Sequence, residues 1–407
     1  MPAPARLPAA ARLPTPSPLF ALAAIAICHG AYVLLAGVMV APDTGIYDFW
    51  AQRLIDSGFD YAAITAEAST RFPAVLYLLF VTFVALLKLL FGAAWATALV
   101  AINLAADAVL GALLVRLVGR TTASPLAGWV ALGLYLGCFG IAQWVRFALS
   151  DTTFCLLAFL IFSLAAERVL GDARRWGGVA LLAVVGVFYR PTGLVLLPDL
   201  GWAAYLSRRG SPRIGRTAAL LVLAALILGA AAAFAWFMQD PGRWPFDTLS
   251  ATFRYVAADY ALGEVVSARS ETYHSPPSAL LDYMLISADR FLHFFAPGAA
   301  GFSAGHWAAE LVFFIPCYAL ALWLLVALCG GRTAFGDREQ RVFLAAAGAI
   351  LAYAVFHGLV QVDFDWRYRL PILPHLILLA AGGAADIRGI RASASSHRAV
   401  RRAIGRR

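Results

Sequence analysis

Residues 19–48 read LFALAAIAICHGAYVLLAGVMVAPDTGIYD, a long apolar stretch that ends in a short segment with two carboxylates. The apolar part, Leu19 to Val40, is long enough to cross a bilayer as a helix, which takes about 20 residues. Asp43 and Asp48 follow directly, where such a helix leaves the membrane. Acidic side chains beside a membrane span are uncommon unless water, protein contacts or chemistry require them. The stretch therefore predicts a membrane protein with a polar site at the end of its first span.

The overall composition is that of a multi-pass membrane protein. Of the 407 residues, 62% are hydrophobic and 14% are charged, whereas soluble domains carry about 25% charged residues. The mean hydropathy is +0.77. The net charge is +9 at pH 7, but the basic residues gather in short clusters between apolar runs. Such clusters are typical of cytoplasmic loops, so they indicate topology and not nucleic-acid binding.

The apolar runs predict an all-α protein with ten helical crossings and both termini in the cytoplasm. Residues 176–206 are too long for one span and are interrupted at Arg190-Pro191-Thr192-Gly193, so they are predicted to form a hairpin of two short helices that breaks in the outer half of the membrane. Residues 72–91 are interpreted as an interfacial or re-entrant helix, because this places Arg116 and Arg120 in the cytoplasm. The other eight crossings are 19–40, 95–118, 124–144, 152–170, 216–238, 307–330, 341–361 and 370–386.

This topology gives one membrane domain, 18–387, between a disordered cytoplasmic tail, 1–17, and a basic cytoplasmic tail, 388–407. Its outer loops are 41–94, 239–306 and 362–369. Within the middle loop, 278–297 is predicted to be an amphipathic helix on the membrane, with Asp282, Asp289 and Arg290 on its polar face. The isolated polar residues of the spans, His29, Asn103 and Asp107, are interpreted as contacts between helices.

Four groups of polar residues fall on the predicted outer face, each beside a short turn. Any one of them is also explained as an anchor at the membrane interface, but four on the same side predict one polar cavity at the outer boundary. The groups are Asp43 with Asp48; Arg146 with Ser150 and Asp151; Arg190; and Asp363 with Asp365, Arg367, Tyr368 and Arg369.

A cavity with acids and arginines suits group transfer from a lipid-linked phosphate. A guanidinium holds phosphate oxygens with two parallel hydrogen bonds and offsets the charge of a departing phosphate. A carboxylate beside an incoming hydroxyl serves as general base. Asp43 and Asp48 lie about 140° apart around a helix, so one can be the base while the other orients a substrate or binds a divalent metal, and the need for metal is left open.

Two other functional classes are compatible with a polytopic chain. A transporter or flippase of a lipid-linked sugar could also use outer arginines. Transporters place their sites near the midplane, however, whereas these charges gather at one boundary. A non-catalytic assembly subunit has no specific feature in its favour.

Five short motifs follow one another along the chain at these outer positions. Together they resemble the outer-face motifs of the GT-C membrane glycosyltransferases, in particular the protein mannosyltransferase and lipid A aminoarabinose transferase group. The first motif, D-x3-Y-x3-A-x2-L…G, is formed by Asp43, Tyr47, Ala51 and Leu54 and closes at Gly58. The next three are P-x3-Y at Pro73 and Tyr77, S/T-D at Ser150 and Asp151, and R/K-x-x-G-L at Arg190, Gly193 and Leu194. The last, D-x-R-Y-x-x-P-x-x-P, is formed by Asp365, Arg367, Tyr368, Pro371 and Pro374.

The resemblance implies inverting transfer of a sugar from a polyprenyl-phosphate donor to a hydroxyl of a glycan, lipid or protein. It places the reaction on the extracytoplasmic face of the plasma (inner) membrane. On the match, Asp43 is the general base, and Arg190 and Arg367 or Arg369 hold the phosphate. Many relatives carry Glu where this chain has Thr44. The further substrate-binding candidates are Tyr47, Asp48, Arg146, Asp151, Asp365 and Tyr368.

Overall fold

The computed structural model describes residues 14–68, 74–170, 176–207, 254–298, 301–360 and 367–404. The predicted span 216–238 lies outside these ranges, as does most of the predicted tail 1–17. Within the described ranges the chain is helical, and its one isolated β-bridge joins Met39 to Phe147. The predicted all-α class is therefore confirmed for this part of the chain.

The helices follow the apolar runs closely, and short 3-10 turns mark the breaks between several of them. The helices are α1 (Pro18–Ala36), α2 (Pro42–Asp56), α3 (Tyr61–Ala68), α4 (Ala74–Phe91), α5 (Trp95–Thr122), α6 (Pro125–Gly137), α7 (Phe139–Val145), α8 (Asp151–Val169), α9 (Gly177–Tyr189), α10 (Leu196–Ser207), α13 (Arg254–Ala261), α14 (Leu280–Phe294), α15 (Ala304–Cys329), α16 (Asp337–Leu359) and α17 (Leu373–Ile404).

Six segments of the described chain are long and apolar enough to cross a membrane, or seven if one bent pair counts as a single span. This makes the chain a multi-pass membrane protein. The bent pair is α6 and α7, which meet at 54° within the predicted span 124–144, because Cys138 between them has an extended backbone. Two predicted elements, 72–91 and 95–118, are joined through the 3-10 turn Gly92–Ala94 into the single stretch Leu76–Thr122.

The predicted break inside 176–206 is confirmed. α9 ends at Tyr189, Arg190 is extended, and the 3-10 turn η2 (Pro191–Val195) leads into α10. Glycine is required at position 193, because a Cβ there would lie 2.0 Å from the carbonyl oxygen of Gly186. These two backbone segments approach closely, and α9 and α10 pack against each other on either side of the break at Arg190.

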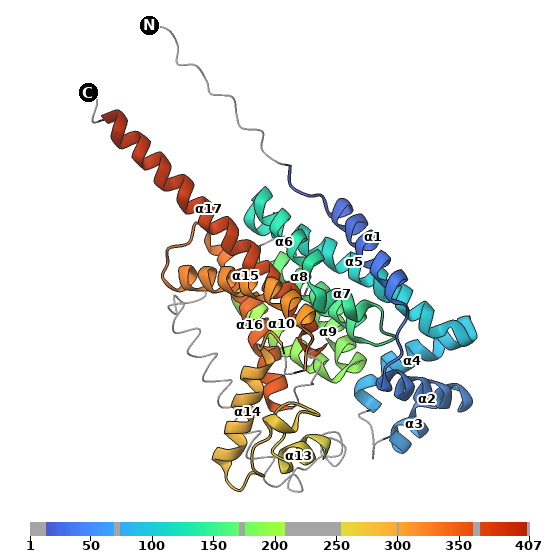
Figure 1. The fold of residues 1–407 in the computed structure, drawn as a ribbon. Coiled ribbons are helices and arrows are strands. Elements are labelled where there is room, and N and C mark those ends of the chain that lie inside the picture. The colour runs from blue at the N-terminus through green and yellow to red at the C-terminus, as the bar shows by residue number, and fades with distance from the viewer. Residues whose placement is uncertain are drawn as a thin grey trace.

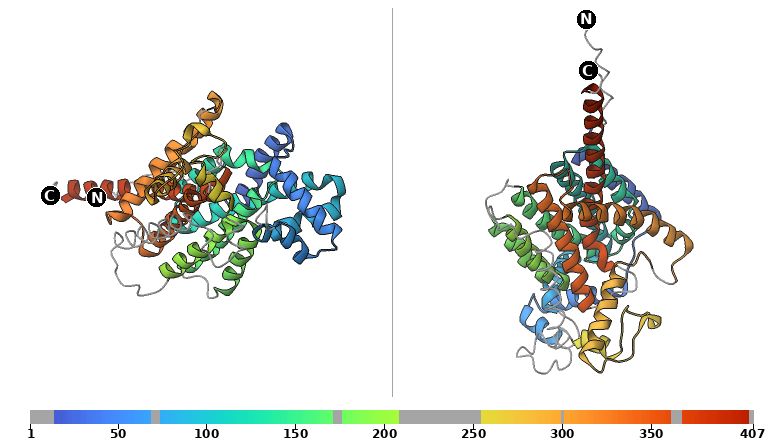
Figure 2. Two further views of the ribbon diagram at one scale, coloured as in Figure 1. Left: turned by 90° about the horizontal axis from the view of Figure 1, so that it is seen from below. Right: turned by 90° about the vertical axis from the view of Figure 1, so that its left-hand side faces the viewer.

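The two ends of the helical bundle differ in character (Figures 1 and 2). The start of α1 and the far end of α17 lie at one end, and α2, α3, α13 and α14 lie at the opposite end. α1 packs against α5, and α15 packs against α17. The predicted basic tail is helical as far as Ile404, so it continues the last helix away from the bundle.

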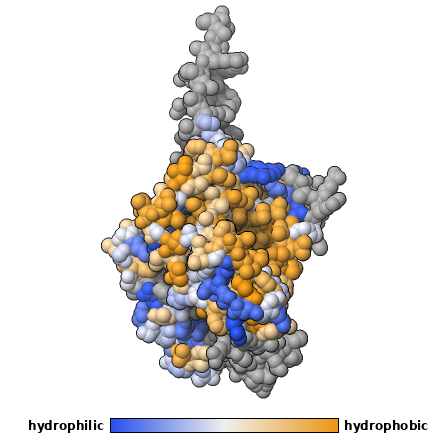
Figure 3. All heavy atoms as spheres, turned by 90° about the vertical axis from the view of Figure 1, so that its right-hand side faces the viewer, coloured by the Kyte–Doolittle hydropathy of each residue, from blue (hydrophilic) through white to orange (hydrophobic). Residues whose placement is uncertain are grey.

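The outer surface of the bundle suits contact with lipid tails. Figure 3 shows a broad hydrophobic area with hydrophilic residues gathered below it. Leu34 and Leu35 on α1 are 87% and 90% exposed, and Leu90 on α4 is 75% exposed. Aqueous surfaces of soluble proteins rarely expose so many large apolar side chains together.

Polar residues inside the spans pair with one another, as predicted. Asp107 on α5 accepts a hydrogen bond from Tyr135 on α6, and its other oxygen lies 2.6 Å from Nδ1 of His29 on α1. Asn103 donates to the carbonyl oxygens of Phe147 and Leu149. These hydrogen bonds link α1, α5 and α6 to one another, and they link α5 to the connection that precedes α8.

The predicted amphipathic helix in 278–297 is present as α14, but its polar face differs from the prediction. Arg290 is buried, at 1% exposure, and donates hydrogen bonds to the backbone oxygens of Glu264 and Val360. The guanidinium is satisfied by backbone carbonyls that only the folded chain brings together. The exposed side chains of α14 include four leucines, Leu280, Leu281, Leu285 and Leu292.

Candidate active site

Asp43 is presented by the first turn of α2. Pro42 starts this helix, and the helix dipole stabilises a carboxylate at this position. Asp43 Oδ2 lies 2.6 Å from Nη2 of Arg367, which belongs to the 3-10 turn η5 (Arg367–Ile372). Asp43 is 33% exposed and Arg367 is 11% exposed. The carboxylate is therefore open to a ligand, while its cation is nearly buried.

A second ion pair forms where α8 begins. Asp151 is the first residue of α8, and its carboxylate pairs with the guanidinium of Arg190 at the break after α9. Arg190 also lies 3.5 Å from Oγ of Ser150. Both partners of the pair are about 5% exposed. The predicted group at the start of the fourth span thus meets the predicted group at the hairpin break.

Tyr368 connects the two ion pairs. The Cζ atom of Arg190 lies 5.4 Å from the centre of its ring, and that of Arg367 lies 5.1 Å from it. Cations over an aromatic face are attracted by the charge distribution of the ring. We refer to Asp43, Asp151, Arg190, Arg367 and Tyr368 as the paired-arginine cluster.

Two tyrosines line the same region. Tyr47 lies one turn after Asp43 on α2, and its ring centre is 5.5 Å from that of Tyr77 on α4. The two phenols share a hydrogen bond, and both interact electrostatically with Arg190 and Asp43. Burial, with a smaller effect from Tyr77, raises the pKa of Tyr47 well above its usual value. Tyr47 is therefore a neutral hydrogen-bonding group beside the cluster.

Two residues of this region were not among the predicted site residues. Tyr77 appears in the sequence as the tyrosine of the P-x3-Y motif, which was the available signal for it. His357, near the end of α16, stacks on Tyr368 with ring centres 4.9 Å apart. Its sequence context, a histidine within an apolar run, gives no indication of that partner.

Several predicted residues lie elsewhere. Asp48 is 45% exposed and pairs at 2.8 Å with Lys88 on α4, so it faces away from Asp43. Arg146 donates to the carbonyl oxygen of Ala36 at the end of α1, where it anchors that terminus. Asp363 and Asp365 lie outside the described residues.

Arg369 is separated from Arg367 although only one residue lies between them. It donates to the carbonyl oxygen of Ala296 and lies 3.6 Å from Glu310 on α15. The tight turn η5 sends the two side chains to different elements. Arg367 therefore belongs to the paired-arginine cluster, and Arg369 belongs to a neighbouring pocket.

The carboxylates of this region do not gather into a metal site within the described chain. No group of three or more His, Cys, Asp and Glu side chains is placed there to hold an ion. Asp43 and Asp48 each have their own cationic partner. The arrangement is instead suited to an anionic ligand that meets Arg367 beside an accessible carboxylate.

Searches of known protein families, curated proteins and solved structures found no match to this chain.

Proposed function

We propose that this chain is a membrane glycosyltransferase that moves a sugar from a polyprenyl-phosphate donor to an acceptor hydroxyl. The observation that supports it most strongly is the ion pair between Asp43 and Arg367 beside the pair of Asp151 and Arg190. These residues come from four separate places in the sequence, and all four carry the outer-face motifs that resemble the GT-C enzymes.

The chemistry needs one base and one anion-binding group. Asp43 accepts the proton of the acceptor hydroxyl as the hydroxyl oxygen attacks the anomeric carbon of the sugar. The bond between that carbon and the phosphate oxygen breaks, and polyprenyl phosphate leaves with the electron pair. Attack from the face opposite the leaving group inverts the configuration of the sugar.

The two arginines have different roles in this proposal. Arg367 offers five N–H donors in a planar fork, so it can orient Asp43 and also bind phosphate oxygens. Arg190 is buried and held by Asp151, so it acts as a positioning residue that fixes Tyr368 and the break after α9. Tyr47 and Tyr77 supply hydrogen bonds to the sugar or phosphate.

We also propose that the cluster lies on the extracytoplasmic side of a ten-crossing protein in the plasma (inner) membrane. Asp43 lies in the first turn of α2, which is at the opposite end of the bundle from the start of α1, and it contacts Arg367 on η5. Arg116 and Arg120, near the end of α5, pair with Glu167 near the end of α8, so both helices end in a charged region. Lys88 reaches Asp48, which supports an interfacial position for α4.

The test is the release of polyprenyl phosphate by purified protein that is given a polyprenyl-phosphate sugar and an acceptor. We expect release by the wild type and its loss in Asp43→Asn, because an amide cannot accept the proton. Asp56→Asn, on the same helix with its side chain paired to Gln52, is the matched control and should retain release. Movement of the lipid across vesicles without bond cleavage would contradict the proposal and favour a flippase.

A further inference from the structure

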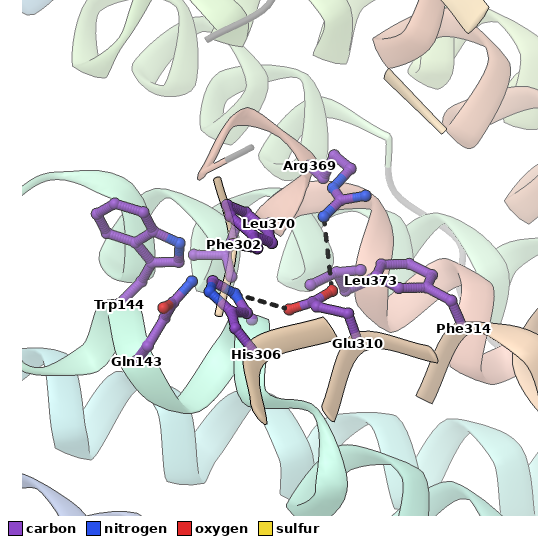
Figure 4. A pocket seen from close by; sticks show the side chains of 10 residues that line it. Gln143, Trp144, Phe302, His306, Glu310, Phe314, Arg369, Leu370 and Leu373 are labelled. Carbon is purple, nitrogen blue, oxygen red and sulfur yellow. Dashed lines mark ion pairs between the residues drawn. The ribbon is translucent and has the colours of Figure 1, made fainter. Parts of the chain in front are cut away.

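A pocket lies beside η5 and is built largely from elements other than those of the paired-arginine cluster. Its walls come from α7, the start of α15 and η5 (Figure 4). Its enclosed part has room for about one water-sized group, such as a single hydroxyl, and the rest of the hollow opens to solvent. Its side chains mix polar groups with aromatic rings: Gln143, Trp144, Phe302, His306, Glu310, Phe314 and Arg369.

The pocket contains a buried carboxylate, that of Glu310. It is 4% exposed, and its carboxylate lies between His306 at 3.7 Å and Arg369 at 3.6 Å. Both distances exceed the roughly 2.7–2.9 Å of a charge-assisted hydrogen bond. A buried carboxylate without short hydrogen bonds is costly. A ligand that donates hydrogen bonds to Glu310 would remove that cost.

The rest of the lining defines the kind of ligand. The amide of Gln143 both donates and accepts, and the indole of Trp144 donates through its N–H. Their side chains lie across the pocket from Arg369 (Figure 4). The rings of Trp144 and Phe302 add apolar faces. A sugar ring matches this lining, because its hydroxyls both donate and accept while its C–H face is apolar.

Other ligand classes fit less well. An anion would lie against the carboxylate of Glu310. A metal ion would find one carboxylate beside a guanidinium, and no group of three metal-ligating side chains occurs in the described part of the chain. A long apolar chain would leave Glu310 and Gln143 without hydrogen-bonding partners.

We propose that this pocket binds the hydroxyl-bearing edge of an uncharged sugar ring. This proposal rests on the proposed function only in the role that it gives to the sugar. That sugar is either the end of the acceptor molecule or the sugar carried by the lipid donor. Binding itself requires no transfer. Arg367 and Arg369 belong to the same short turn, so the pocket lies next to the proposed reaction centre.

The test is sugar binding to the full chain in lipid nanodiscs, which avoids detergents that carry sugar headgroups. Saturation-transfer NMR with methyl glycosides of mannose, arabinose and glucose measures the dissociation constants. We expect Glu310→Gln and Gln143→Ala each to weaken binding about tenfold or more, because each removes hydrogen bonds in a desolvated pocket. Glu271→Gln makes the same charge change at a side chain that is 56% exposed and should bind as the wild type does.

Competition separates the two sources of the sugar. A short-chain polyprenyl-phosphate sugar that displaces the methyl glycoside assigns the pocket to the donor, and undiminished glycoside binding assigns it to the acceptor. Gln143→Ala changes a half-buried side chain, so its result stands even if Glu310→Gln does not fold.

The outcomes distinguish this proposal from the proposed function. Asp43→Asn should lose transfer and keep glycoside binding. If the wild type transfers sugar but Glu310→Gln and Gln143→Ala change neither binding nor KM, the pocket proposal is wrong and the proposed function stands. If both variants lose glycoside binding but neither the wild type nor any variant transfers sugar, the pocket proposal stands and the proposed function is wrong. Absence of glycoside binding by the wild type, or binding of inorganic phosphate in its place, overturns the sugar assignment.

Discussion

At the scale of single residues, the partner of a side chain decides its role. Asp43 and Asp48 share a helix and a chemical type, yet one pairs with Arg367 on η5 and the other with Lys88 on α4. Five positions along a helix turn the second carboxylate about 140° away from the first. Arg367 and Arg369 differ in the same way, because they share η5 but pair with different carboxylates, Asp43 and Glu310.

Arg367→Lys tests whether the guanidinium fork is needed. We expect kcat/KM for the lipid donor to fall about 10- to 100-fold, because an ammonium cannot hold a carboxylate and a phosphate with paired hydrogen bonds. Steady-state release of polyprenyl phosphate measures it. Arg53→Lys, on the α2 helix that carries Asp43, is the control. An unchanged kcat/KM in Arg367→Lys would show that Arg367 contributes charge alone.

Asp259 on α13 predicts a pH effect on stability. Burial, with a smaller effect from Glu264, raises its pKa from the ordinary 3.8 to about 7. The folded state therefore binds a proton that the unfolded state releases, so the contribution of this carboxyl to stability is fully present below about pH 4 and is lost as the pH rises through 7. Hydrogen exchange of the α13 amides, corrected for intrinsic rates, should show protection decreasing over that range. The decrease should be absent in Asp259→Asn, and a decrease of equal size in that variant would contradict the assignment.

At the scale of elements, the break between α9 and α10 holds the site together. Arg190 is extended there and reaches Asp151 at the start of α8. The sequence predicted this break from its Pro and Gly residues, and it predicted the polar contacts of Asp107 and Asn103 within the spans. It did not predict the burial of Arg290, because the carbonyl groups that satisfy Arg290 belong to residues 264 and 360, which only the fold brings together.

Gly193→Ala tests that break. The added Cβ would lie 2.0 Å from the Gly186 carbonyl oxygen, so the backbone must move and carry Arg190 with it. We expect a loss of about 1–3 kcal/mol of stability and a reduced rate of transfer, measured by thermal unfolding in nanodiscs and by phosphate-lipid release. Gly201→Ala on α10 meets no atom within 4 Å and should be neutral or slightly stabilising. Equal behaviour of the two variants would contradict the close approach at position 193.

At the scale of the whole molecule, different elements lie at the two ends of the bundle. The chain enters α1 and leaves α17 at one end, and α2, whose first turn carries Asp43, lies at the opposite end. Composition and the apolar runs were sufficient to predict a multi-pass helical protein. The pairing of the charged residues depends on side-chain partners from distant segments. For this reason the sequence could not tell Arg367 from Arg369, or name Lys88 as the partner of Asp48.

The proposed orientation predicts the pattern of labelling by a membrane-impermeant maleimide in intact cells. Asp56→Cys, at the end of α2, should react from outside, because it lies at the end of the bundle that carries the cluster. Asp337→Cys, at the start of α16, should react only after the membrane is made permeable. The unsubstituted chain, with exposed Cys28 and Cys329 on its own spans, supplies the background. The opposite pattern would place the cluster in the cytoplasm.

The most direct test is a cryo-EM structure of Asp43→Asn in nanodiscs with an intact polyprenyl-phosphate sugar, since this variant should bind the donor without consuming it. We expect the phosphate to contact the guanidinium of Arg367 and the anomeric carbon to lie beside position 43. A phosphate held away from Arg367, with the sugar remote from position 43, would contradict it.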